Sequence, residues 1–223
     1  MAENINGALI TGQQICWDES HGYYLRNGSG KGELNPDVDC SYFVGYCLQQ
    51  NGFNVSPSWY TGSMITTLSS YPGFSHYIWS PGFQWRHGDI AVYDEGGGRY
   101  GHTFFYAENV RGYNATSLNW STADGTTSLL SSAIIEASSS RGWVDPDTDE
   151  PIPGDQDNGY GLHPEVWVHQ YTDPSSAHTW HIFRWDAGPG PGPIPLTFEQ
   201  QIALYSTKNR RRKDESIRYK VFY

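Results

Sequence analysis

The spacing of apolar residues changes once along the chain, from a helical period to strand-like alternation. Apolar side chains at positions 40, 43, 44, 47 and 48 follow one helix face, with Asp39 suited to the N-cap and Gly52 to the stop. From Gly88 onward the alternation predicts strands over residues 89–93, 100–108 and 113–120, and another over 179–185. A helix ahead of an antiparallel meander over residues 88–120 predicts an α+β fold.

A run of alternating Gly and Pro marks the clearest boundary in the chain. It extends from Ala187 to Pro195, and this alternation excludes both helix and sheet. We therefore predict one folded domain over residues 1–187, a Gly/Pro linker over 188–195 and a basic segment over 196–223. The last segment is too short to form a domain of its own.

The charge distribution argues against a nucleic-acid partner for the predicted domain. The first 195 residues hold 7 of the 14 Lys and Arg residues and 21 of the 24 Asp and Glu residues, a net charge of −14. Such a surface repels a phosphate backbone. The sequence also contains no apolar run long enough to cross a membrane, and its N-terminus does not have the pattern of a signal peptide.

Cys40 is the best candidate nucleophile among the three cysteines. Cys40 and Cys47 share the predicted helix at a separation of roughly 10 Å, too far for a disulfide, so we expect Cys40 to be a free thiol. Its place in the first turn of the helix exposes it to the positive end of the helix dipole, which favours the thiolate.

Two further residues complete a candidate catalytic set. His102 lies on the strand over residues 100–108 and suits the role of general base. Asn119 shares its face if the two strands pair, opposite either position 102 or position 104, and its amide oxygen could orient the imidazole. Each residue also has a structural reading: a core cysteine, a packing histidine and a turn asparagine.

The short motifs around these residues resemble the NlpC/P60 and CHAP group of cysteine hydrolases, and within it the phage peptidoglycan hydrolases of the amidase type. The resemblance spans about residues 15–186. It rests on four motifs: Asp39-Cys40-Ser41, Arg86-His87-Gly88-Asp89-Ile90, Gly101-His102-Thr103 and Leu118-Asn119-Trp120. Residues 21–28, upstream of the Cys, are a further counterpart.

The resemblance implies a papain-like fold, with N-terminal helices and a nucleophile helix packed on an antiparallel sheet. It implies hydrolysis of an amide bond in bacterial peptidoglycan, either as an N-acetylmuramoyl-L-alanine amidase or as a peptide endopeptidase, without a cofactor or metal. We expect Cys40, His102 and Asn119 to be catalytic. The residues expected to contact substrate are Tyr24, Asp39, Ser41 and Trp120. Related enzymes often carry His or Glu two residues before the Asn, where this chain has Ser117.

The implied setting is a phage-associated enzyme, such as an endolysin, that reaches the cell wall after lysis or as part of a virion. The C-terminal segment could then contact other phage components. Two other functions stay open: a non-catalytic wall-binding or virion module on the same fold, and an acyltransferase.

Two other groups of polar residues are candidates for metal sites. The acidic loop over residues 145–158 begins with an Asp-x-Asp-x-Asp pattern but does not have the glycine and the final Glu of a calcium loop, which favours a solvated loop. The remaining histidines do not have zinc-site spacing, so we expect surface or packing roles for His163, His169, His178 and His181.

Overall fold

The computed structural model describes residues 2–18, 38–96, 101–113, 127–138 and 166–187. The chain groups into two compact units, Met1–Gly190 and Pro191–Tyr223, and all described residues belong to the first. The predicted linker over 188–195 and the basic segment over 196–223 lie outside the described residues. Within the described ranges, every helix is too short or too polar to cross a membrane.

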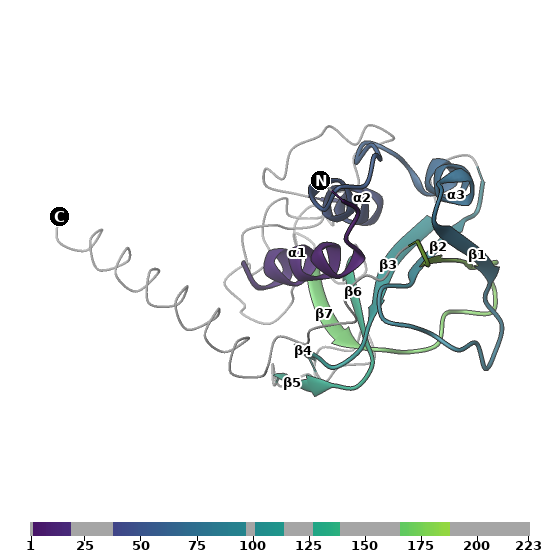
Figure 1. Cartoon of the computed structure of the whole chain (residues 1–223). Helices are drawn as coiled ribbons and strands as arrows, with labels where there is room; N and C mark the ends of the chain where they lie inside the picture. The colour runs from purple at the N-terminus through teal and green to yellow at the C-terminus, as the bar shows by residue number, and fades with distance from the viewer. Residues whose placement is uncertain (1, 19–37, 97–100, 114–126, 139–165, 188–223) are drawn as a thin grey trace, which may run out of the picture. The chain divides into compact units, whose positions relative to one another are not determined.

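The described part of the chain has an α+β fold, as predicted (Figure 1). In it, three helices precede all of the strands. The helices are α1 (Ile5–Asp18), α2 (Cys40–Gln50) and α3 (Thr61–Ser70). The strands are β1 (Phe74–Ile78), β2 (Ile90–Asp94), β3 (Gly101–Ala107), β4 (Val110–Tyr113), β5 (Thr127–Leu130), β6 (Ala133–Ala137), β7 (Val166–Gln170) and β8 (His181–Trp185).

These strands form one sheet in the order β1-β8-β2-β3-β6-β7-β4-β5. Neighbouring strands are antiparallel except β4 and β7, which pair in parallel at Tyr113 and His169. The predicted pairing of β2 with β3 is confirmed, with Tyr93 opposite His102. This register places the side chain of Tyr93 on the same face as that of His102.

The third strand of the predicted meander, over residues 113–120, lies outside the described residues except for Tyr113. Residues 110–112, which the prediction placed between strands, belong to β4, and β4 pairs with β5 and β7. Within the described residues β6 lies next to β3. Between β3 and β4, Asn109 adopts a left-handed backbone with φ 54°, which Asn tolerates better than most residues, and its N–H bonds to the carbonyl of Ser131.

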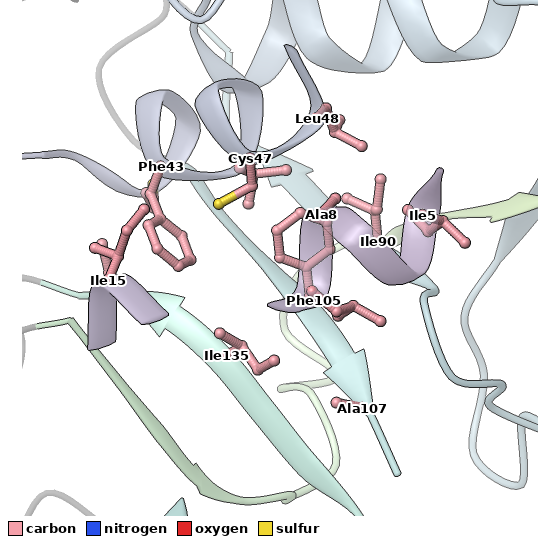
Figure 2. Packing of buried hydrophobic residues seen from close by; sticks show 14 of the residues in the cluster. Ile5, Ala8, Ile15, Phe43, Cys47, Leu48, Ile90, Phe105, Ala107 and Ile135 are labelled. Atoms are coloured by element: carbon pink, nitrogen blue, oxygen red, sulfur yellow. The ribbon is translucent and has the colours of Figure 1, made fainter. Parts of the chain in front are cut away.

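Alternate residues of the central strands separate into two apolar clusters, one on each face of the sheet. Phe105 and Ile135 belong to the cluster that packs under the helices, together with Ile15, Phe43 and Cys47 (Figure 2). Neighbouring positions on these strands, such as Phe104 and Ile134, point to the opposite face. They join a second cluster that is rich in aromatic rings: Trp79, Ala91, Phe104, Ile134, Trp180 and Ile182. Both faces of the sheet are therefore buried, and His102 belongs to the second face.

A buried ion pair anchors the start of β2 to β8. Asp89 is 1% exposed, and its two carboxylate oxygens accept hydrogen bonds from Nε and Nη2 of Arg184 at 2.8 and 2.7 Å. The same carboxylate accepts the backbone N–H of Arg86 at 2.8 Å, across a turn in which Gly88 has φ 92°. This bidentate geometry is the one in which an Arg–carboxylate pair is strongest.

We predict that Asp89→Ala destabilises the fold by about 3–5 kcal/mol, because it leaves the Arg184 guanidinium buried without its counter-charge. Urea unfolding followed by tryptophan fluorescence measures the change. Asp173→Ala is the matched control, since Asp173 is exposed and its removal should change stability by less than about 0.5 kcal/mol. Equal midpoints for the two variants would contradict the anchoring role.

Candidate active site

Cys40 is the first residue of α2, where the helix begins as the sequence predicts. Asp39 is the N-cap, and its Oδ1 accepts the backbone N–H of Tyr42 at 2.7 Å. Burial raises the pKa of Asp39, although the hydrogen bonds from Tyr42 and Ser41 oppose that rise. The cap leaves the first N–H groups of the helix, including that of Cys40, at the positive end of the helix dipole.

Trp59 holds the first turn of α2 in place. Its indole Nε1 donates to the carbonyl of Ser41 at 2.7 Å, and the Ser41 hydroxyl lies 2.9 Å from the carbonyl oxygen of Trp59. Gly45, one turn further along, has no room for a side chain, because a Cβ there would lie 2.8 Å from Cα of Pro57. The loop that carries Trp59 therefore packs directly on the helix backbone.

His102 joins the Cys40 thiol to a carboxylate. Its Nε2 lies 2.6 Å from Oε2 of Glu136. Cys40 also raises the pKa of His102, through a hydrogen bond and through its charge, which indicates that the thiol lies next to the ring. The His102 side chain is 21% exposed, so the imidazole is accessible from one side. The arrangement has a nucleophile, a base and an orienting group in a line.

The third member of this set is Glu136 on β6, which sequence reasoning missed. Extending the register of β3 and β6 places Glu136 opposite Phe104, one diagonal step from His102 on the same face. The signal was present in the sequence: Glu136 is the one charged residue in the strand Ala133–Ala137. A lone carboxylate in an apolar strand is costly to bury, so it indicates a paired or functional group.

Glu136 and His102 shift each other's pKa. Burial lowers the pKa of His102, but the charge of Glu136 and the bonds to Glu136 and Cys40 outweigh it and raise the pKa to about 10. Burial would raise the pKa of Glu136, yet the facing His102 and His169 hold it well below its usual range. At neutral pH the pair is therefore an imidazolium and a carboxylate. A cationic imidazole beside a thiol is the usual partner of a thiolate nucleophile.

Aromatic rings lie close to His102. Tyr93 lies directly across from it on β2, and Trp180 contacts both residues, with ring centroids 4.5 Å from Tyr93 and 6.4 Å from His102. The ring of His178 stacks on Tyr93 at 4.2 Å, and its Nδ1 lies 3.1 Å from Oε1 of Glu95. These rings restrict the orientation of the imidazole.

The structure describes some of the predicted site residues and not others. Cys40 and His102 are brought together. Asp39 and Ser41 make hydrogen bonds within the protein, and their expected contact with substrate stays a prediction. The others lie outside the described residues: Tyr24, Ser117, Asn119 and Trp120. The orienting role expected of Asn119 also stays a prediction. Among the described residues, Glu136 is the side chain at Nε2 of His102.

The other cysteines and His181 have surroundings of their own. Cys16 and Cys47 are buried, and burial is the chief cause that raises the pKa of each thiol. His181 pairs with His76 on β1, with ring nitrogens 2.9 Å apart. The acidic loop over 145–158 and His163 fall outside the described ranges. In the part of the chain that the structure covers, no three His, Cys, Asp or Glu side chains are grouped to hold a metal ion.

The geometry supports nucleophilic attack by sulfur with proton transfer through one histidine. Comparison of the chain with models of protein families, with curated proteins and with solved structures finds no match to any of them.

Proposed function

We propose that the protein is a cysteine hydrolase that cleaves an amide bond of bacterial peptidoglycan, on a papain-like fold of the NlpC/P60 and CHAP type. The observation that carries the proposal is that His102 bridges the Cys40 thiol and the Glu136 carboxylate. In this arrangement His102 has the position of a general base and Glu136 that of its orienting group. The short motifs around Cys40, Asp89 and His102 support the substrate class by resemblance.

In the proposed reaction the Cys40 sulfur attacks the amide carbonyl carbon, and a carbon–sulfur bond forms. The backbone N–H of Cys40 stabilises the oxyanion, since it lies at the start of α2, where N–H groups have no partner within the helix. His102 then donates its Nδ1 proton to the leaving amine as the carbon–nitrogen bond breaks, which leaves a thioester. Water gives a proton to His102 and attacks the thioester. The carbon–sulfur bond breaks, the product leaves as a carboxylic acid, and the thiolate and imidazolium are restored.

The bond within peptidoglycan is either the N-acetylmuramoyl-L-alanine amide or a bond of the peptide stem. A phage-associated enzyme acting after lysis, or carried on a virion, is the setting that the resemblance favours.

We predict that Cys40→Ala abolishes the release of soluble fragments from purified cell walls, because the variant has no nucleophile. Mass spectrometry of the released muropeptides measures the activity and identifies the bond. Cys47→Ala is the matched control, since Cys47 is also a buried thiol on α2 but lies about two turns beyond Cys40, and its variant should retain activity. Equal release by Cys40→Ala and the parent would contradict the mechanism and favour a non-catalytic wall-binding module.

We predict that Glu136→Gln moves the basic limb of the pH profile of kcat/KM to lower pH. The leaving amine needs a protonated His102, whose pKa of about 10 in the parent is raised by the Glu136 charge. Removing that charge lowers the pKa of His102, so activity is lost earlier as pH rises. Steady-state rates over a pH series measure the shift, and a basic limb that stays in place would exclude Glu136 as the partner of His102.

A further inference from the structure

His169 lies on the far side of Glu136 from His102, in a place that the proposed reaction does not use. It is on β7, and the pairing of β6 with β7 sets Trp167 opposite Glu136 and His169 opposite Ile134. Because directly paired residues share a face, His169 is on the same face of the sheet as Glu136 and one diagonal step from it. The side chain is 2% exposed.

Both ring nitrogens of His169 face hydrogen-bond acceptors. Nε2 lies 3.0 Å from Oε1 of Glu136, and Nδ1 lies 3.0 Å from the backbone carbonyl oxygen of Gln170. A carboxylate and a carbonyl cannot donate a proton, so each bond requires an N–H on the ring. The contact with Glu136 therefore uses the Nε2 proton of His169.

The two oxygens of Glu136 are thus divided between two histidines. Oε2 faces His102, while Oε1 accepts from His169 and, at 3.2 Å, from Nε1 of Trp167. The rings of Trp167 and His169 stack with centroids 4.0 Å apart, which fixes the position of both donors. A buried carboxylate needs this kind of compensation to stay charged.

We propose that His169 is a positioning residue that acts through Glu136: it holds the carboxylate charged and aimed at His102, and so maintains the reactive state of Cys40. Four groups then follow one another in one chain of contacts, from the Cys40 sulfur through His102 and Glu136 to His169. Networks of this kind are worth more than their separate pairs, because each bond polarises the next. The proposal rests on Cys40 being the nucleophile of the proposed function, but not on the identity of the substrate.

The test is the rate at which iodoacetamide alkylates Cys40 at neutral pH, read by mass spectrometry of the Cys40 peptide in the full-length protein. Alkylation reports the thiolate without any cell-wall substrate. The variants are His169→Leu, which removes both ring nitrogens, and His169→Gln, which keeps an N–H for Glu136 but not the imidazole ring. His76→Gln is the control, since His76 lies on β1 and pairs with His181. Thiolate absorbance in the ultraviolet, taken as the difference from Cys40→Ala, provides a second readout.

We expect His169→Leu to slow alkylation about tenfold, the size of one lost charge-assisted hydrogen bond, and to reduce the thiolate absorbance. His169→Gln should fall between His169→Leu and the parent, and His76→Gln should match the parent. In a Glu136→Gln background, either substitution at His169 should have no further effect, because the coupling passes through the carboxylate.

The proposal would be overturned if Cys40 were alkylated at the parent rate in folded His169→Gln and His169→Leu variants. So would an equal loss in the parent and Glu136→Gln backgrounds, because His169 would then act on the fold in general. If His169→Leu does not fold, His169→Gln alone decides between these outcomes. If the variants change the alkylation rate as expected but the parent protein is inactive on cell walls, His169 keeps its role and the proposed substrate is rejected.

Discussion

The carboxylate of Glu136 is the constraint around which the site is built. A charge that is buried to this degree is costly, and the structure compensates it with donors from two neighbouring strands: His102 on β3, and Trp167 and His169 on β7, on either side of Glu136 itself on β6. The orientation of His102 follows from this arrangement, and so does the direction in which its second nitrogen faces. The chemistry available to Cys40 therefore depends on a residue that does not touch the sulfur.

Strand β3 contributes side chains to both faces of the sheet. Phe105 points to the face covered by α1 and α2, where it contacts Phe43 edge-on with centroids 6.4 Å apart. His102 and Phe104 point to the opposite face. At the start of β3, Gly101 has no room for a side chain, since a Cβ there would lie 2.6 Å from the carbonyl oxygen of Tyr93. This close approach holds the strand end, and hence His102, against β2.

The parts of the fold set by local pattern were predictable. The period of apolar residues and the Asp39 cap located α2, and alternation located β2, β3 and the face of His102. Glu136 was missed because its contact with His102 spans 34 positions and depends on which strand pairs with β3. The bounds of β4 were not predicted, because its partner β5 lies well beyond it in the sequence. Asn119 lies outside the described residues, so its role stays a prediction.

The central claim is that His102 is an imidazolium held between Cys40 and the Glu136 carboxylate at neutral pH. Nitrogen NMR of protein labelled at the histidine rings, with His102 assigned by substitution, measures its protonation directly through a pH titration. The account predicts that His102 keeps both ring protons through neutral pH and titrates near 10. A His102 ring that loses a proton at about pH 6.5, the ordinary value for histidine, would contradict it.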